Sequence, residues 1–261
     1  MTAAAHADAR GMNPDELLGV FARAADAQRD SLRDLVGAAR RARTDRPGQY
    51  HLDTVADAAI LPVLHAAGVR VLSEESGWTG PIDSPVTVVL DPVDGSTNCA
   101  RGIPYWGISV CALDAQGMLC SLVENGATGA AFTAVRGGGA WLDDTQLTPA
   151  STSEIERAVV ALTAMPGRAL PWKQYRALGS SALALCDLAA GNLDAFYDTT
   201  DDAHHGWDYL GAALVCAEAG AHLMDVHGRE LVVADPDARR QLIGACTPEL
   251  LDVLRAETGA A

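Results

Sequence analysis

The sequence has no long apolar run, few aromatic residues and a shortage of positive charge. Aromatic side chains make up 5% of its 261 residues, and 19 lysines and arginines face 34 aspartates and glutamates. No run approaches the roughly 20 apolar residues of a membrane-spanning helix, so we expect no membrane partner. The net charge of −15 argues against nucleic acid. An anionic small substrate stays open, because a bound divalent cation can invert the charge of a site.

The six cysteines follow neither a metal-binding nor a disulfide pattern. They are scattered without a Cys-x-x-Cys pair, at Cys99, Cys111, Cys120, Cys186, Cys216 and Cys246. Their neighbours are apolar or small, which favours reduced, partly buried thiols. The first residues lack the charged region and apolar stretch of a signal peptide. We therefore expect a cytoplasmic protein.

Hydrophobic periodicity predicts an α+β subdomain over residues 1–145, with N-terminal helices and an antiparallel sheet that carries most of the metal ligands. Asn13 and Pro14 mark the start of a first helix, which carries apolar residues as far as Val36 and is broken by Pro47 and Gly48. A second apolar stripe at helical spacing follows over residues 52–67. Four strands then alternate with turns, among them the hairpin turn Gly137-Gly138-Gly139.

Residues 146–261 alternate between strand and helix patterns, which predicts an α/β subdomain that closes the active site. Residues 231–234 are predicted as one of its last strands, before a helix over residues 248–257. The whole chain is therefore of class α/β, with an α+β N-terminal half.

A single stretch brings candidate ligands for a cation and for an anion together. It follows a β-branched run and reads Asp91-Pro92-Val93-Asp94-Gly95-Ser96-Thr97-Asn98. We expect the strand to stop at Asp91, because Pro92 cannot donate a ladder hydrogen bond. Ser96 or Thr97 would cap a short helix. The amides of Gly95, Ser96 and Thr97 would then offer a positive terminus for a phosphate.

Further carboxylates lie at two other element ends. Glu74 and Glu75 follow a short strand, and Asp208 follows Trp207 in the first turn of a helix. Each alone is typical of a solvated surface. Carboxylates that gather beyond strand ends repel one another unless a cation compensates them, so their combination favours a metal site. His204 and His205 lack partners at zinc spacing, which favours a structural or supporting role.

With these motifs in this order, the chain resembles the inositol monophosphatase family of lithium-sensitive, magnesium-dependent sugar phosphatases. The likeness runs from about residue 52 to residue 220. It implies a layered αβαβα sandwich and a homodimer. It also implies two Mg²⁺ ions, with a weaker third near Glu74.

The resemblance also implies a set of site residues. The implied metal ligands are Glu74, Asp91, the carbonyl of Val93, Asp94 and Asp208. The implied phosphate-binding residues are Gly95, Ser96 and Thr97. The implied catalytic residues are Glu74 and the pair Asp53 and Ser96, which would orient the attacking water. The implied substrate-binding residues are Ser180, Ser181 and an acidic residue among Asp198, Asp201 and Asp202. Glu75 and Trp207 would support the site from behind.

Residues and resemblance together predict a Mg²⁺-dependent phosphomonoesterase that hydrolyses a small sugar or inositol-type phosphate with a metal-activated water. Phosphatases of the same fold acting on histidinol phosphate, fructose 1,6-bisphosphate, adenosine 3′,5′-bisphosphate or a specialised-metabolism sugar phosphate are alternatives. A haloacid-dehalogenase-type phosphatase needs an Asp-x-Asp loop, whereas two residues separate Asp91 from Asp94. The non-enzyme alternative is an inactive metal-binding scaffold.

Overall fold

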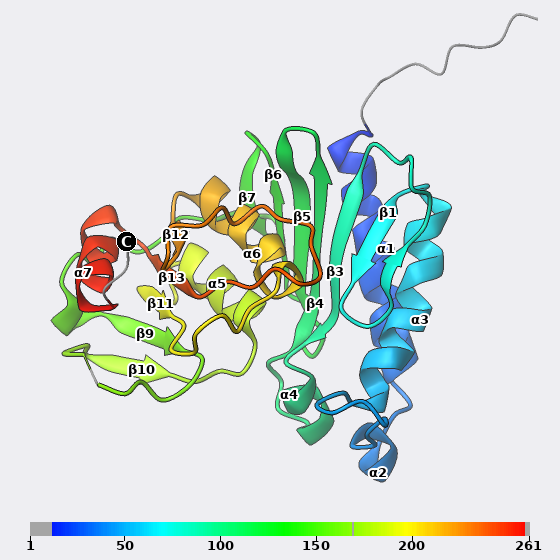
Figure 1. Ribbon diagram of the computed structural model, residues 1–261, viewed down its shortest axis with the longest axis horizontal. Helices are drawn as coiled ribbons and strands as arrows, with labels where there is room; N and C mark the ends of the chain where they lie inside the picture. Colours follow the sequence, from blue (N-terminus) through cyan, green and yellow to red (C-terminus); the bar gives the residue numbers. More distant parts are fainter. Residues whose placement is uncertain (1–11, 169, 259–261) are drawn as a thin grey trace, which may run out of the picture.

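Helices and sheets alternate in five layers (Figure 1). The computed structural model describes residues 12–168 and 170–258. The helical layers are α1 (Pro14–Leu32) with α3 (His51–Ala66), then α5 (Ser181–Ala189) with α6 (Gly206–Ala219), and finally α7 (Pro248–Thr258). An eight-stranded sheet separates the first two, and a five-stranded sheet separates the last two. This arrangement confirms the predicted αβαβα sandwich.

The larger sheet has the strand order β2-β1-β3-β4-β5-β6-β7-β8. Its strands are β1 (Arg70–Ser73), β2 (Gly77–Thr79), β3 (Thr87–Asp94), β4 (Gly107–Asp114), β5 (Gly117–Asn125), β6 (Ala131–Val135), β7 (Gly139–Leu142) and β8 (Thr145–Gln146). β1 pairs with β3 in parallel, and the other neighbours pair antiparallel. The glycine turn before β7 joins it to β6 as the predicted hairpin.

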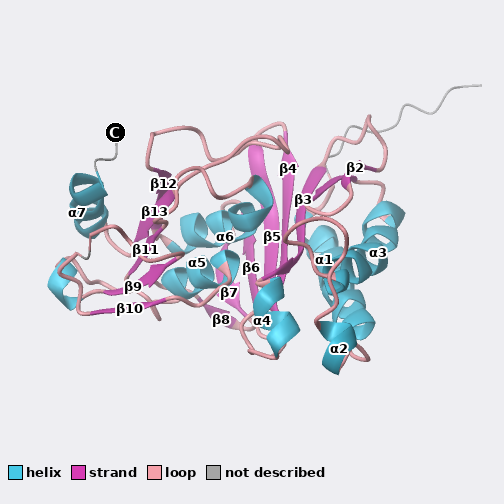
Figure 2. Ribbon diagram, turned by 60° about the horizontal axis from the view of Figure 1, so that its bottom comes forward, coloured by secondary structure: helices cyan, strands magenta, loops and turns pink. Residues whose placement is uncertain are grey.

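The smaller sheet has the order β10-β9-β11-β13-β12 and faces α5 and α6 (Figure 2). Its strands are β9 (Val159–Leu162), β10 (Gln174–Arg176), β11 (Ala195–Tyr197), β12 (His222–Asp225) and β13 (Leu242–Ala245), and the 3-10 turn η1 (Ile155–Arg157) precedes it. The predicted strand over residues 231–234 is wrong, because that segment is a partly exposed loop outside the sheet. The strand is β13, whose four residues are all buried.

Two predicted ends of elements are also wrong. α1 begins at its predicted cap, where the Asn13 side chain accepts a hydrogen bond from the Asp15 amide, but it ends at Leu32. Val36 is extended, with φ −126° and ψ 160°, and Gly37 has a positive φ of 56°. These two backbone conformations are not those of a continuing helix, so α1 is separate from the short α2 (Gly37–Arg40).

β3 does not stop at Asp91 but continues to Asp94. Its ladder with β4 shifts register between these two residues, so Pro92 lies where the pairing is irregular. A proline is tolerated at such a bulge because no ladder hydrogen bond is required of it there. Directly after β3 the chain enters α4 (Ser96–Arg101).

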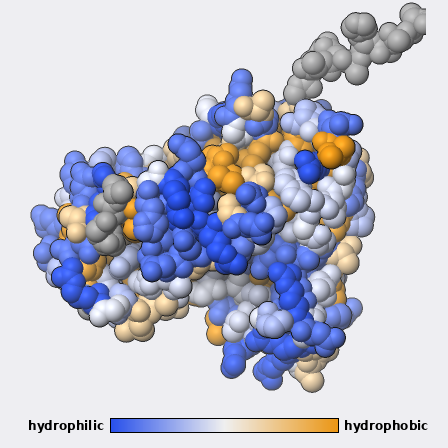
Figure 3. All heavy atoms as spheres, viewed as in Figure 1, coloured by the Kyte–Doolittle hydropathy of each residue, from blue (hydrophilic) through white to orange (hydrophobic). Residues whose placement is uncertain are grey.

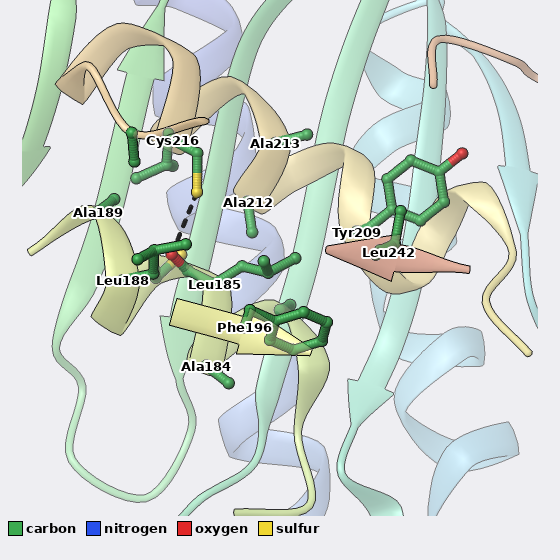
Figure 4. Packing of buried hydrophobic residues seen from close by; sticks show 14 of the residues in the cluster. Ala184, Leu185, Leu188, Ala189, Phe196, Tyr209, Ala212, Ala213, Cys216 and Leu242 are labelled. Carbon is green, nitrogen blue, oxygen red and sulfur yellow. Dashed lines mark hydrogen bonds between the residues drawn. The ribbon is translucent and has the colours of Figure 1, made fainter. Parts of the chain in front are cut away.

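Two hydrophobic cores hold the layers together. One lies between α1, α3 and the larger sheet, and the other surrounds α5 and α6 between the two sheets. Figure 4 shows the second core, where Phe196 of β11 and Leu242 of β13 lie beside α5 and α6 and Tyr209 projects from α6 itself. Cys216 Sγ of α6 donates to the Leu185 carbonyl of α5 at 3.2 Å. All six cysteines are buried and free, as predicted.

The face seen in Figure 3 is mostly hydrophilic, with a hydrophobic area in its upper centre. It is hollowed in the lower part of the view, between the lobe that holds β9 and β10 and the end that holds α4. No helix in the described part of the chain is long and apolar enough to cross a bilayer. The division into subdomains at residue 145 stays a prediction.

Candidate active site

Carboxylates from three distant parts of the chain meet at one end of the larger sheet. Glu74 follows β1, Asp91 lies in β3, and Asp208 lies in the first turn of α6. One oxygen of each lies within 4.8 Å of the others. The parallel pairing of β1 and β3 places the first two side by side, since the Glu74 amide donates to the Leu90 carbonyl at 3.1 Å.

Burial and repulsion from neighbouring carboxylates raise the pKa of all three groups. Desolvation is the larger cause for each, and it raises the pKa of Glu74 to about 8 with help from Asp208 and Glu75. The pKa of Asp208 rises to about 7, and that of the buried Asp91 rises well above its usual value. Three carboxylates this close need a compensating charge to ionise together. An all-oxygen set of this kind fits a hard divalent cation such as Mg²⁺.

Asp94 borders this cluster, but its carboxylate faces the N-terminus of α5. Oδ2 accepts hydrogen bonds from the Ala182 amide at 2.8 Å and from the Ser180 hydroxyl, and Oδ1 accepts one from the Ser181 amide at 3.4 Å. Its charge raises the pKa of both Asp91 and Asp208. Asp94 therefore connects the acidic cluster to the start of α5.

Gly95 forms the sharp turn between β3 and α4. It is the N-cap of α4 and has φ 85°, so the predicted cap by a Ser96 or Thr97 side chain is wrong. A Cβ on Gly95 would lie 3.0 Å from the Gly179 carbonyl oxygen and 3.1 Å from that of Tyr105. Both its backbone conformation and its surroundings therefore favour glycine.

Asp53 lies at the start of α3, with one oxygen engaged and one free. Oδ2 accepts from the Tyr50 amide at 2.8 Å, while Oδ1 is buried without a hydrogen-bond partner among the described residues. Burial raises the pKa of Asp53 to about 7, and the charge on Glu75 adds to the rise. The Tyr50 amide and the nearby Ser96 hydroxyl oppose it. The structure thus brings Asp53 close to Ser96.

Glu75 and Trp207 are the sequence neighbours of the cluster residues Glu74 and Asp208. Glu75 accepts a hydrogen bond from the Gln49 side chain and pairs with Arg46 at 3.6 Å, which ties the segment before α3 to the end of β1. The Trp207 carbonyl accepts from Ser109 Oγ at 3.2 Å, and its ring stacks on His205 with centroids 4.4 Å apart. Because Glu75 is next to Glu74 in the sequence and Trp207 is next to Asp208, these contacts hold the backbone beside two residues of the cluster.

A pocket of about 310 Å³ adjoins Asp94 and is lined by Ser180, Ser181 and His204, among others. Asp198, which directly follows β11, is fully buried and is hydrogen-bonded to three residues that line this pocket, His204, Thr163 and Thr200. Asp201 and Asp202 are both exposed, and Asp202 pairs with Arg229 at 2.6 Å.

His204 is the residue whose position the sequence analysis missed. Its Nε2 lies 2.7 Å from Ser181 Oγ, and its Nδ1 lies 2.6 Å from Asp198 Oδ2. The three residues come from the end of β11, the loop after it and the start of α5. No sequence spacing signals this contact, because it depends on how α5 packs against that loop.

Several known proteins are similar to this chain. The model of the inositol monophosphatase family matches residues 22–258. An inositol-1-monophosphatase of Mesorhizobium japonicum is 32% identical over 70% of this chain and 74% of its own length. A fructose-1,6-bisphosphatase/inositol-1-monophosphatase of Methanothermobacter thermautotrophicus is 30% identical over 76% and 79%. A protein of Pasteurella multocida named Nus factor SuhB is 29% identical over 77% and 83%.

Solved structures show the same fold. A Pyrococcus horikoshii protein described as similar to inositol-1 monophosphatase superposes with a TM-score of 0.84 at 24% identity, covering 94% of this chain and 98% of its own. The suhB protein of Bartonella henselae superposes with a TM-score of 0.79 at 26% identity, covering 92% and 97%. The family model spans most of the chain and the relatives share its fold, so the chain belongs to the inositol monophosphatase family.

Proposed function

We propose that this protein is a Mg²⁺-dependent phosphomonoesterase that acts on a small sugar or inositol-type phosphate. The observation that carries the proposal is the cluster of Glu74, Asp91 and Asp208, whose oxygens lie within 4.8 Å of one another. Membership of the family, with relatives named for inositol-1-monophosphatase and fructose-1,6-bisphosphatase activity, supports a phosphatase. The same match over residues 22–258 favours this reading over a haloacid-dehalogenase-type enzyme.

The proposed ligands divide into two overlapping sets. Glu74, Asp91 and the Val93 carbonyl would hold one Mg²⁺, and Asp91, Asp94 and Asp208 would hold a second. A weaker third ion would lie near Glu74. Bound Mg²⁺ supplies charge that neutralises the phosphate, lowers the pKa of a water and stabilises the leaving oxygen.

The chain itself would position the phosphate and the water. Amides of Gly95, Ser96 and Thr97, at the turn into α4, would donate to phosphate oxygens. The free Oδ1 of Asp53, close to the Ser96 hydroxyl, would orient the water for in-line attack. The water oxygen would bond to phosphorus as the ester bond breaks, and the alcohol would leave with a proton.

Isotope labelling tests this direct attack. In a single turnover in ¹⁸O-labelled water, we expect the label in the released phosphate. Label that appears first in an aspartate of the protein would instead show a covalent intermediate. We further propose that the protein works as a homodimer, because the family resemblance implies a dimer.

A phosphate-release screen tests the activity and narrows the substrate. It would compare inositol 1-phosphate, fructose 1,6-bisphosphate, histidinol phosphate, adenosine 3′,5′-bisphosphate and a sugar monophosphate, first with Mg²⁺ and then with Li⁺ added. We expect Mg²⁺-dependent turnover of at least one, with inhibition by Li⁺. If none of these substrates is hydrolysed, the alternative of an inactive metal-binding scaffold is favoured. Relatives named Nus factor SuhB also leave that alternative open, since the name states no enzymatic activity.

A further inference from the structure

A polar side chain lies in the otherwise apolar face that α1 packs against the larger sheet (Figure 1). The buried residues of this helix are Leu17, Val20, Phe21, Ala24, Ala25, Gln28 and Leu32. Within α1, which the structure describes in full, Gln28 is the one polar residue of this set, and it is fully buried. A polar group placed so deeply needs a partner and calls for an explanation.

The partner of Gln28 is the backbone of β3, in the segment that carries Asp91 and Asp94. Gln28 Nε2 donates a hydrogen bond to the Pro92 carbonyl. Within the described strands, Pro92 has no ladder partner on either side, because pairing with β1 ends at Leu90 and the ladder with β4 passes from Asp91 to Asp94. The Pro92 carbonyl therefore receives from a side chain the bond that a regular ladder would supply.

The peptide group between Pro92 and Val93 is held at both of its ends. Its carbonyl oxygen accepts from Gln28 Nε2, and its amide donates to Asp91 Oδ1 at 2.9 Å. Because a peptide group is planar, the bond to the carbonyl also fixes the direction of the amide. Gln28 thereby acts on the carboxylate of Asp91, a member of the acidic cluster. The next carbonyl along the chain, that of Val93, is itself a proposed metal ligand.

Stability alone would favour an apolar residue at position 28. Gln28 Oε1 is buried without a hydrogen-bond partner among the described residues. Such an acceptor destabilises the fold, whereas a methionine of nearly the same length would bury no unpartnered oxygen. The side-chain amide cannot be turned over, because Oε1 would then face the Pro92 carbonyl and two acceptors would meet. The bond to Pro92 is thus what distinguishes glutamine from an apolar side chain here.

We propose that Gln28 is a positioning residue of the metal site. It acts through the peptide group between Pro92 and Val93, and so orients the Asp91 carboxylate and the Val93 carbonyl for the cation. This inference rests on the proposed function, because it concerns the Mg²⁺ ions that the proposed phosphatase uses. It extends the site to α1, a helix that contributes none of the proposed ligands.

Mg²⁺ binding to variants of Gln28 tests the proposal. Gln28→Met removes the donor and keeps the length of the side chain, and calorimetric titration should show an affinity about tenfold lower than that of the wild type. The urea unfolding midpoint in EDTA should not fall, because an unpartnered acceptor is removed and no apolar contact is lost. Gln28→Leu, a second variant without a donor, should behave in the same way. Leu32→Met, one turn further along the same buried face, is the matched control and should keep the wild-type affinity.

Hydrogen exchange of the Val93 amide reports on the peptide group without any metal. In metal-free Gln28→Met this amide should exchange about tenfold faster than in the wild type, because release of the Pro92 carbonyl weakens the bond from the amide to Asp91 Oδ1. The amide of Val89, a residue that is paired with both β1 and β4, should exchange at an unchanged rate.

Two results would overturn the inference. One is a Mg²⁺ affinity that stays unchanged in both Gln28→Met and Gln28→Leu, and the other is equal exchange of the Val93 amide in Gln28→Met and the wild type. Failure of the proposed function looks different. A wild-type protein that binds Mg²⁺ but hydrolyses no phosphate ester is not a phosphatase, and the Mg²⁺ affinities of the variants still decide the role of Gln28.

Discussion

Replacing Glu74 by glutamine should stabilise the metal-free protein at neutral pH. The pKa of Glu74 is about 8 in the folded protein against an ordinary value of 4.5, because the side chain is desolvated and faces Asp208 and Glu75. A raised carboxyl pKa means that the folded state keeps a proton that the unfolded chain releases. Stability therefore falls as pH rises from 4.5 toward 8.

The size of this effect follows from the two pKa values. Each pH unit between the unfolded pKa and the solution pH costs about 1.4 kcal/mol, so at pH 7 the cost is about 3 kcal/mol. Glu74→Gln removes this titration and also relieves the neighbouring Asp91 and Asp208. We expect its free energy of unfolding to match that of the wild type near pH 4.5 and to exceed it by about 3 kcal/mol at pH 7.

Urea unfolding in EDTA at several pH values measures the difference. Glu156→Gln, at an exposed glutamate of η1, is the matched control and should follow the wild type at every pH. Added Mg²⁺ should reverse the order, because the wild type gains stability from the ion and Glu74→Gln gains less. Parallel pH profiles of the wild type and Glu74→Gln in EDTA would refute the raised pKa of Glu74 in the folded protein.

Three other substitutions test neighbouring parts of the structure. Asp94→Asn should lower Mg²⁺-dependent phosphate release at least about 100-fold, and full activity would count against its role as a ligand. Gly95→Ala should cost about 1–2 kcal/mol in urea unfolding, because alanine is strained at φ 85° and its Cβ would crowd Gly179; an unchanged midpoint would contradict this. The pKa of Asp225 is lowered to about 2, and its hydrogen bonds with Arg229 contribute most to that. Asp225→Asn should therefore cost about 2 kcal/mol at pH 7, and the difference should vanish as the pH falls from 4 to 2, whereas a constant difference would argue against the ionised pair.

Local sequence chemistry predicts the parts of the site that depend on strand ends. Glu74 follows the apolar strand β1, Asp91 follows the apolar run of β3, and parallel pairing of β1 with β3 brings them together. Asp208 was recognisable by its place in the first turn of a helix and by the family resemblance. The αβαβα layering followed from the same resemblance. Predicting these features requires only the type of each helix or strand and the order of these elements along the chain.

Other features depend on packing between distant segments and could not be predicted from the sequence. β13 has only four residues, one of them a glycine, so it is too short to show a strand pattern. It lies inside the smaller sheet because β11 and β12 flank it. The course of β3 through Pro92 requires a register shift that only the pairing with β4 shows. The contact of His204 with Ser181 arises where α5 meets the loop after β11, a tertiary contact without a sequence period.

Binding of Mg²⁺ to the metal-free protein tests the central claim most directly. Asp91 is buried within 4.8 Å of the other two carboxylates, and we propose that it contributes to both ion sites. Calorimetric titration should show at least two Mg²⁺ ions bound per wild-type chain, and Asp91→Asn should bind neither tightly while keeping the far-ultraviolet circular dichroism of the folded protein. Equal stoichiometry and affinity in the two proteins would contradict the account.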